Sequence, residues 1–182
     1  MIVLGLFELQ TPHDPALPPG VIPAMAAALE SCLPVRVAGL KPLLAPEEAF
    51  DAKRGQWSAP ALLEDVLASL PDGIPKALGV TASDLFIPML SFVYGQAQLK
   101  GRAGVVSVAR LRQEYYGLPP NDALLLERAR KEAVHEAGHL LGLVHCSSPG
   151  CVMRLSVQVG QIDLKGEAPC PACAARLREG TA

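Results

Sequence analysis

The stretch HEAGHLLGLVHC, residues 135–146, decides how this chain folds and where its chemistry lies. Two residues four apart on a helix share a face, so His135 and His139 can hold one metal ion. His145 cannot join them from a continued helix, because ten residues would carry it about 15 Å along the axis. The helix must therefore end and the chain must fold back. Gly142 permits this turn, since glycine adopts a left-handed conformation at little cost.

Three histidines with one position left open are typical of a catalytic zinc site. The alternative is three unrelated histidines, but the chain has only four, and three of them fall within eleven residues at ligand spacing. Glu136 follows His135 directly, and we expect it to act as general base on the water that the metal holds. Its alternative interpretation is an ordinary helix carboxylate. His13 lies in a Pro/Asp-rich segment and is expected at the surface.

Four of the five cysteines form two close pairs near the C-terminus. Cys146 and Cys151 are one pair, and Cys170 and Cys173 form a CxxC motif. Four thiolates in this pattern predict a tetrahedral structural zinc, and hence two zinc ions per chain. Two disulfides, an iron–sulfur cluster and a redox CxxC remain as alternatives, although the last leaves the first pair unexplained. Cys32 is expected to be a small buried residue.

The complete pattern HExxHxxGxxHCx4CxMx16CxxC resembles that of the archaemetzincin family of metallopeptidases. Met153 stands where this resemblance implies a methionine turn that supports the metal site. The segments 84–88, 92–95 and 110–111 resemble the family too. The segment 54–57 resembles it more weakly, with Trp57 in place of an expected tyrosine. The spacer before CxxC is one residue shorter than the family pattern.

The expected elements and the resemblance together indicate an α+β, metzincin-like fold. A mixed twisted five-stranded sheet, an active-site helix and a small zinc-stabilised C-terminal subdomain are its expected parts. We expect one domain over residues 1–182, with subdomains of about 1–142 and 143–182. The predicted strands are 2–7, 35–37, 84–87, 90–99 and 104–109, with residues 41–57 as a loop. The predicted helices are 22–33, 60–70, a long helix capped by Asn121 or Asp122, and 174–178.

Composition narrows the classes of function. Half of the 182 residues are hydrophobic, 19% are charged and the formal net charge is −2. This is a globular composition, and it gives no electrostatic case for nucleic acid or an anionic membrane as partner. The opening MIVLGLFEL lacks the basic flank and the cleavage site of a signal peptide, so we expect a cytoplasmic protein. The oligomeric state stays open, with a monomer plausible.

The resemblance implies a zinc peptidase that hydrolyses peptide or protein substrates. The sequence does not decide between aminopeptidase and endopeptidase action, and a metal-binding module of the same fold with little turnover is the alternative. The strand around 92–97 would pair with an extended peptide as an antiparallel strand. Tyr115 or Tyr116 could donate to an oxyanion or simply pack, and Arg54 and Gln56 could face substrate or solvent. Two pairs four apart, Glu127/Lys131 and Arg128/Glu132, are expected to support the long helix.

Overall fold

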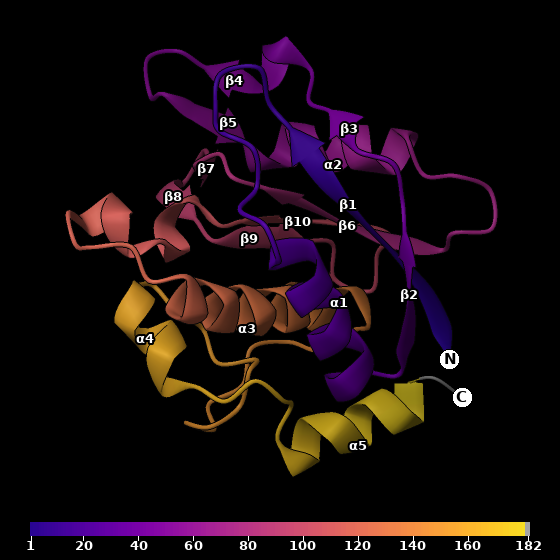
Figure 1. The fold of residues 1–182 in the computed structure, drawn as a ribbon. Coiled ribbons are helices and arrows are strands. Elements are labelled where there is room, and N and C mark those ends of the chain that lie inside the picture. The colour runs from indigo at the N-terminus through magenta and orange to yellow at the C-terminus, as the bar shows by residue number, and fades with distance from the viewer. Residues whose placement is uncertain (181–182) are drawn as a thin grey trace.

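The main sheet is mixed and lies at the centre of the molecule (Figure 1). The computed structural model describes residues 1–180, so the last two residues of the predicted C-terminal subdomain lie outside the described residues. The strands pair in parallel except for β9 and β10, which are antiparallel. In spatial order they are β2 (Val35–Gly39), β1 (Ile2–Gln10), β6 (Lys76–Thr81), β10 (Ala103–Ser107) and β9 (Gly95–Ala97), and β3 (Leu43–Leu44) also pairs with β1.

A second, smaller sheet lies beside the main sheet. One of its strands forms part of the wall of the cavity described below. Its strand order is β4-β5-β7-β8. The strands are β4 (Phe50–Asp51), β5 (Gln56–Ser58), β7 (Leu85–Ile87) and β8 (Leu90–Val93). Short 3₁₀ helices at Glu47–Ala49, Ala109–Leu111 and Gln113–Tyr116 lie in the connections.

Helices cover both faces of the main sheet (Figure 1). The first helix, α1 (Val21–Cys32), packs with α3 (Asp122–Leu140) on one face, and α2 (Ala59–Ala68) covers the other. Two short helices, α4 (Val159–Leu164) and α5 (Pro171–Gly180), lie on the far side of α3 from the sheet. Among the described residues no helix is long and apolar enough to cross a membrane.

The apolar run of β1 is buried on both sides, as expected for a strand inside a largely parallel sheet. Leu4 and Leu6 join the core beneath α1 and α3, whereas Phe7 and Leu9 join the core beneath α2. Side chains alternate between the faces of a strand, so one strand supplies both cores. The long helix α3 is preceded by Asn121, whose side chain accepts a hydrogen bond from Leu124 N at 3.0 Å, so Asn121 is the cap of the two that were predicted.

The strand content differs from the prediction in three places. The central strand β6 was not predicted, because its sequence KALGVT holds a lysine, an alanine and a glycine, which disfavour strands in isolation. Tertiary packing overrides this, since Gly79 lies against Phe7 and Val66. The predicted strand 84–87 belongs to the second sheet, and 90–99 divides at Tyr94 into β8 and β9 of different sheets. The predicted loop 41–57 contains three short strands.

Candidate active site and metal centres

The C-terminus of α3 turns back at Gly142, as the sequence predicted. Gly142 has φ of +97° and its N–H donates to His139 O at 2.9 Å. The next N–H, of Leu143, donates to Gly138 O at 2.9 Å. This pair of hydrogen bonds around a left-handed residue is a Schellman motif, which satisfies the last carbonyl groups of the helix. The chain then returns past the end of α3 and carries His145 to the other two histidines.

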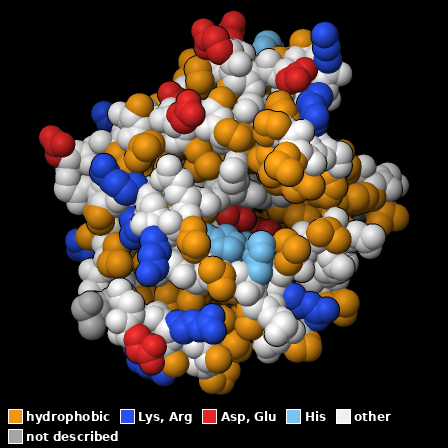
Figure 2. All heavy atoms as spheres, turned by 180° about the vertical axis from the view of Figure 1, so that it is seen from behind, with side chains coloured by type: hydrophobic (Ala, Val, Ile, Leu, Met, Phe, Trp, Pro, Cys, Tyr) orange, Lys and Arg blue, Asp and Glu red, His pale blue; other side chains and the backbone are white. Residues whose placement is uncertain are grey.

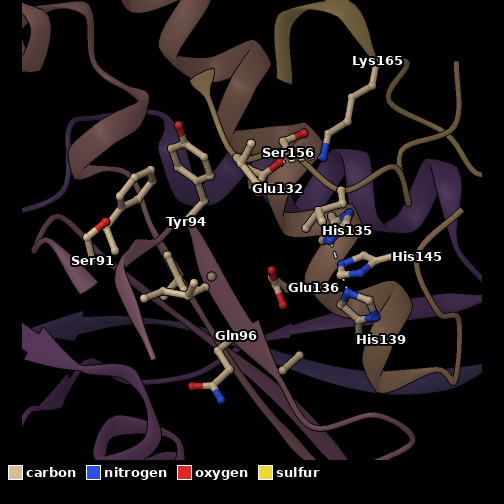
Figure 3. A pocket seen from close by; sticks show the side chains of 17 residues that line it. Ser91, Tyr94, Gln96, Glu132, His135, Glu136, His139, His145, Ser156 and Lys165 are labelled. Carbon is tan, nitrogen blue, oxygen red and sulfur yellow. Dashed lines mark hydrogen bonds and ion pairs between the residues drawn. The ribbon is translucent and has the colours of Figure 1, made fainter. Parts of the chain in front are cut away.

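The three histidines converge on one point at the edge of the cavity (Figure 3). One ring nitrogen from each lies within 4.8 Å of the others, and the Nε2 atoms of His135 and His139 are 3.2 Å apart. Tetrahedral zinc with Zn–N bonds of about 2.0–2.1 Å requires N···N separations of about 3.3 Å. The Nδ1 atoms of the same two rings bond to Val152 O and Leu143 O, each at 2.8 Å. Both Nε2 atoms are therefore left free for a shared metal ion.

Burial keeps these imidazoles in the form that binds metal. It lowers the pKa of His135 well below the usual 6.5, and it lowers the pKa of His139 and of His145 as well. The ammonium group of Lys165 lowers the pKa of all three further. A neutral imidazole has a free lone pair, so the histidines need no deprotonation before a metal binds.

Glu136 points into the same cavity from the neighbouring position on α3 (Figure 3). Its side chain lies directly against Gly95 of β9, where a β-carbon would come within 2.7 Å of Glu136 Cγ. Burial, followed by the carboxylate of Glu132, raises the pKa of Glu136 well above 4.5, and Lys165 partly opposes this. A carboxylate with a raised pKa holds a proton more readily, as a general base must.

The cavity has a volume of about 430 Å³ and lies between the strands at residues 90–97 and helix α3. Figure 2 shows it as a hollow in which the histidine and acidic side chains are visible from outside. The segment 155–157 and Lys165 complete the wall. Three large hydrophobic residues at its border are exposed: Leu90, Leu155 and Val157. The site is therefore open to a ligand of peptide size and has an apolar border.

The four cysteines near the C-terminus also come together. The Sγ atoms of Cys146 and Cys170 are 3.9 Å apart, and those of Cys151 and Cys173 are 3.8 Å apart. Zinc–sulfur bonds of about 2.3 Å in a tetrahedron place the sulfur atoms about 3.8 Å apart, so the spacing fits. All four cysteines are free, which contradicts the disulfide alternative. A backbone N–H, of Cys170, donates to Cys151 Sγ at 3.3 Å and stabilises negative charge there.

Met153 is fully buried and packs against α3 at Gly138, which lies between His135 and His139 in the sequence. A β-carbon on Gly138 would meet its sulfur at 2.5 Å. The carbonyl of Met153 also accepts from the N–H of Cys146 at 2.9 Å, which joins the methionine segment to the segment of the third histidine. The sequence indicated Met153, but it gave no sign that Gly138 makes room for it.

The side chains of Arg54, Gln56, Tyr115 and Tyr116 do not line the cavity. Gln56 is buried, so neither the substrate-facing nor the solvated interpretation holds for it. Its amide donates to Asp84 and to the carbonyl of Ser91, both at 2.9 Å. Arg54 donates to Leu90 O, and Tyr116 donates to Arg110 O. These residues support β8 and the loop before α3, and of the two alternatives left open for the tyrosines, packing fits this placement and the oxyanion role finds no support.

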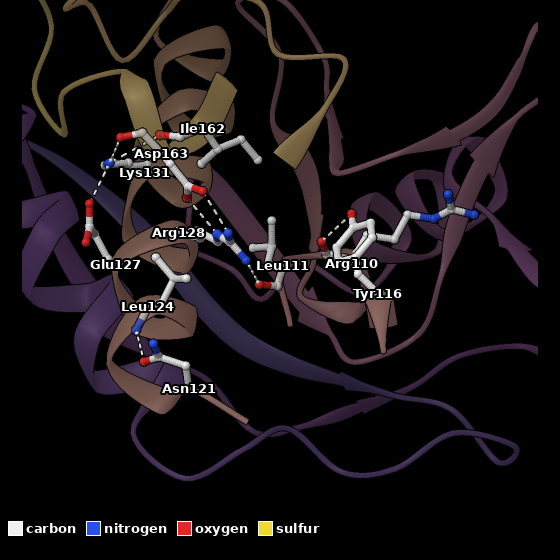
Figure 4. A network of polar contacts seen from close by, with 10 residues as sticks. All are labelled: Arg110, Leu111, Tyr116, Asn121, Leu124, Glu127, Arg128, Lys131, Ile162 and Asp163. Atoms are coloured by element: carbon white, nitrogen blue, oxygen red, sulfur yellow. Dashed lines mark hydrogen bonds and ion pairs between the residues drawn. The ribbon is translucent and has the colours of Figure 1, made fainter. Parts of the chain in front are cut away.

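The buried ion pair of Glu132 and Lys165 also lines the cavity, and sequence reasoning missed it. Glu132 was expected to pair with Arg128, but Arg128 binds Asp163 of α4 instead, with both contacts at 2.7 Å (Figure 4). The other expected pair, Glu127 and Lys131, is present at 2.7 Å. A spacing of one helical turn from Glu136 places Glu132 on the cavity side of α3, which the sequence could have indicated.

Comparisons with known proteins agree with this geometry. The model of peptidase family M54 matches residues 37–179. The archaemetzincin of Methanocaldococcus jannaschii is 43% identical over 134 residues, which cover 74% of this chain and 73% of the relative. That of Methanopyrus kandleri is 44% identical over 133 residues, covering 73% and 72%.

Solved structures show the same likeness in three dimensions. The crystal structure of archaemetzincin from Methanopyrus kandleri matches with a TM-score of 0.85 and 36% identity, covering 99% of this chain and 95% of that one. The archaemetzincin from Archaeoglobus fulgidus, solved in complex with malonate, matches with a TM-score of 0.80 and 32% identity over 96% and 99%. The chain therefore belongs to peptidase family M54, the archaemetzincins, and is a zinc metallopeptidase.

Proposed function

We propose that the chain hydrolyses peptide bonds at the histidine site, where His135, His139 and His145 would hold the catalytic zinc. The observation that carries this is their convergence beside the buried carboxylate of Glu136, at the edge of a cavity of about 430 Å³. Three neutral imidazoles leave one tetrahedral position for chemistry. Zinc held there would lower the pKa of a water molecule and polarise the carbonyl of the scissile bond.

Glu136 is the proposed general base. Its carboxylate takes the proton of the attacking water and then delivers it to the nitrogen of the leaving amine. It adjoins the histidines in sequence but lies against Gly95, which leaves it directed at the cavity instead of at the metal ligands. Its burial excludes bulk water from this proton transfer.

The substrate is proposed to bind along β9. Among the strands of residues 1–180, β9 is last in the order of the main sheet and pairs only with β10, and its residues line the cavity opposite α3. An unpaired edge offers backbone N–H and C=O groups to an extended peptide. We propose that the peptide adds as an antiparallel strand, with its scissile bond between Gly95 and the histidines.

The cysteine site is proposed to hold a second, structural zinc, which gives two zinc ions per chain. Four thiolates close the coordination sphere and leave no position for substrate. Cys146 follows His145 directly, so this zinc would fix the segment that carries the third histidine. On this basis we divide the described chain into subdomains of about 1–142 and 143–180, with the second defined by the methionine turn and the cysteine site.

Digestion of an unbiased peptide library by the zinc-loaded protein, read by mass spectrometry, tests the proposal. We expect cleavage products that are absent with Glu136→Ala, whose zinc content should equal that of the parent because Glu136 is not a ligand. Including peptides with free and with acetylated N-termini separates aminopeptidase from endopeptidase action. Absence of cleavage in either set would contradict the proposal and favour a metal-binding module with little turnover.

A further inference from the structure

One end of the cavity is built from a buried ion pair. Lys165 Nζ lies 2.8 Å from Glu132 Oε1, and the two side chains are 0% and 4% exposed. The ammonium also donates to Arg154 O at 3.4 Å. Burying two charges is costly, and an apolar pair of similar volume is often at least as stable. Stability alone therefore does not explain this ion pair. Its position in the cavity wall suggests a role in binding a ligand.

Among the described residues, four that line the cavity have a buried polar atom without a hydrogen bond: Tyr94 Oη, Gln96 Oε1, Glu132 Oε1 and Ser156 Oγ. Glu132 Oε1 still has the ammonium of Lys165 as an ion-pair partner at 2.8 Å, whereas Ser156 Oγ, beside it, has neither a hydrogen bond nor an ion pair. Buried polar groups usually find partners, so unpartnered ones in a cavity indicate where a ligand would supply them. Figure 3 shows Glu132, Ser156 and Lys165 together at one end of the cavity, with Gln96 at the other.

The direction of β9 decides which part of a peptide reaches this end. Gly95 lies opposite Glu136, Tyr94 precedes it on the side of Glu132, and Gln96 follows on the opposite side. The strand therefore runs away from Glu132. A peptide antiparallel to β9 runs toward Glu132, so the residues after its scissile bond lie at this end.

We propose that Glu132, Ser156 and Lys165 form the subsite for the residue that follows the scissile bond, and that this subsite selects an uncharged hydrogen-bonding side chain. A primary amide, such as that of glutamine, is the expected preference over an apolar side chain of similar size. This inference rests on the proposed peptidase function and on the antiparallel peptide along β9.

Charge balance is what favours a neutral side chain. Apart from Glu136 and the histidines, Glu132 and Lys165 are the only charged residues in the described part of the chain that line the cavity, and they neutralise each other. A cationic side chain would approach the ammonium of Lys165, and an anionic one would approach the carboxylate of Glu132. An amide can donate to Glu132 and accept from the hydroxyl of Ser156.

An apolar side chain in this subsite would offer no hydrogen-bonding group to Ser156 Oγ, which has no hydrogen-bond partner among the described residues. Sites built from hydrogen-bonding groups discriminate strongly against ligands that lack the matching group. We expect the ratio of kcat/KM for glutamine over leucine at this position to be about tenfold or more.

The test uses peptides acetyl-Ala-Ala-Ala-Xaa-Ala-Ala-amide, with Xaa as Gln, Leu, Lys or Glu, and measures kcat/KM for cleavage before Xaa. The parent should prefer Gln. The double variant Glu132→Leu with Lys165→Met replaces the ion pair by apolar side chains, should fold and retain zinc, and should prefer Leu. A purely structural pair would leave the order of preference unchanged, so the inversion distinguishes the two roles.

The matched control is Arg130→Met with Glu167→Leu. This pair, at 2.8 Å, also joins α3 to the segment around residue 165, but it lies outside the cavity wall. Its removal should leave the order of preference as in the parent. Should the cavity double variant fail to fold, Ser156→Ala provides the second measurement, since it removes one hydroxyl from the wall and should lower the Gln/Leu ratio several-fold.

Three results would overturn the inference: a parent that prefers Leu, a cavity double variant that still prefers Gln, or a Ser156→Ala protein with the parent ratio. A parent that cleaves neither these peptides nor peptides with free N-termini contradicts the proposed function separately. The subsite is then tested by calorimetry with the same peptides and the zinc-loaded Glu136→Ala protein. Tighter binding of the Gln peptide than the Leu peptide supports it, and equal affinity refutes it.

Discussion

Gly138 of α3 and the fully buried Met153 are in contact, and a side chain on Gly138 would occupy the space that the methionine fills. The distance from an added β-carbon to Met153 Sδ would be 2.5 Å, and to Met153 Cε 3.2 Å. Gly138 lies on α3 between the two histidines, and the neighbouring Val152 accepts the hydrogen bond of His135. The packing of the Met153 segment against α3 therefore sets the position of His135, a proposed zinc ligand.

We expect Gly138→Ala to lower the melting temperature and the zinc affinity of the histidine site. Alanine favours a helix over glycine by about 1 kcal/mol, but here the fully buried Met153 must shift to admit it. The control is Gly160→Ala in α4, where an added β-carbon meets nothing within 4 Å. The control should melt at or above the parent temperature, and equal behaviour of the two variants would contradict the role of the contact.

Gly95→Ala is expected to lower the rate of peptide hydrolysis without lowering the thermal stability. The added β-carbon would lie 2.7–2.8 Å from the side chain of Glu136, which can move aside because it is flexible. Melting temperature and zinc content should therefore stay near those of the parent. A displacement of about 1 Å at a reacting group costs on the order of 100-fold in rate, so kcat should fall by about 10–100-fold.

The control for this variant is Gly39→Ala, at the end of β2, where the added group meets nothing within 4 Å. Peptide hydrolysis by that protein should equal the parent rate. A Gly95→Ala protein with parent kcat would show that Glu136 does not depend on this neighbour.

The sequence predicted the parts of the site that local geometry determines. Helical periodicity places His135 and His139 on one face, and the left-handed turn at Gly142 follows from the need to bring in the third histidine. A place beside the site for the strand that contains Gly95 was indicated by the family resemblance alone, and Lys165 gave no signal. Lys165 reaches the cavity through tertiary packing, from a segment beyond the metal ligands on α3, so no local pattern marks it.

The same reason explains the errors in the fold. The strand β6 is at the centre of the main sheet, yet its small residues have little intrinsic preference for a strand. Small side chains are required there because other elements pack closely on both faces of the strand. The division of 90–99 into two strands depends on which sheet each half meets, a choice made by partners distant in sequence.

Arg110→Lys should weaken substrate binding without loss of zinc. The Arg110 guanidinium binds both oxygens of Asp84, at 2.7 and 2.8 Å, and lies 4.0 Å from the ring centre of Phe92 in β8. Lysine keeps the charge but loses the two-pronged contact and the stacking. Because β8 forms a wall of the cavity, KM for peptides should rise more than kcat falls. Arg130→Lys is the control, and an equal KM in both proteins would remove Arg110 from the positioning of β8.

The two proposed zinc ions should differ in how easily they are lost. The histidine site has an open position and borders the cavity, whereas four thiolates would enclose the other ion. Metal analysis of the purified protein should give two zinc ions per chain, and dialysis against a chelator should remove one before the other. A single metal in total, or equal rates of loss, would contradict the assignment of an open and a closed site.

The last prediction separates the roles of the two sites. Cys170→Ser with Cys173→Ser should lower the melting temperature and weaken zinc retention at the histidines as well, because Cys146 is bonded to His145 and is held by the same cluster. Supporting interactions around a metal ligand typically change metal affinity on the order of 10–100-fold.

His145→Ala should have the opposite effects on metal content and stability: it should lose the zinc of the histidine site and keep the zinc of the cysteine site. It should also retain most of its thermal stability, because His145 is the most exposed of the three histidines and its loss leaves the buried core intact. Melting temperature and metal content measured on both variants side by side make the comparison. If the double cysteine variant melts like the parent and keeps both metals, the cysteine cluster does not position the third histidine. The C-terminal segment is then held in place by its apolar contacts and by its ion pairs with α3.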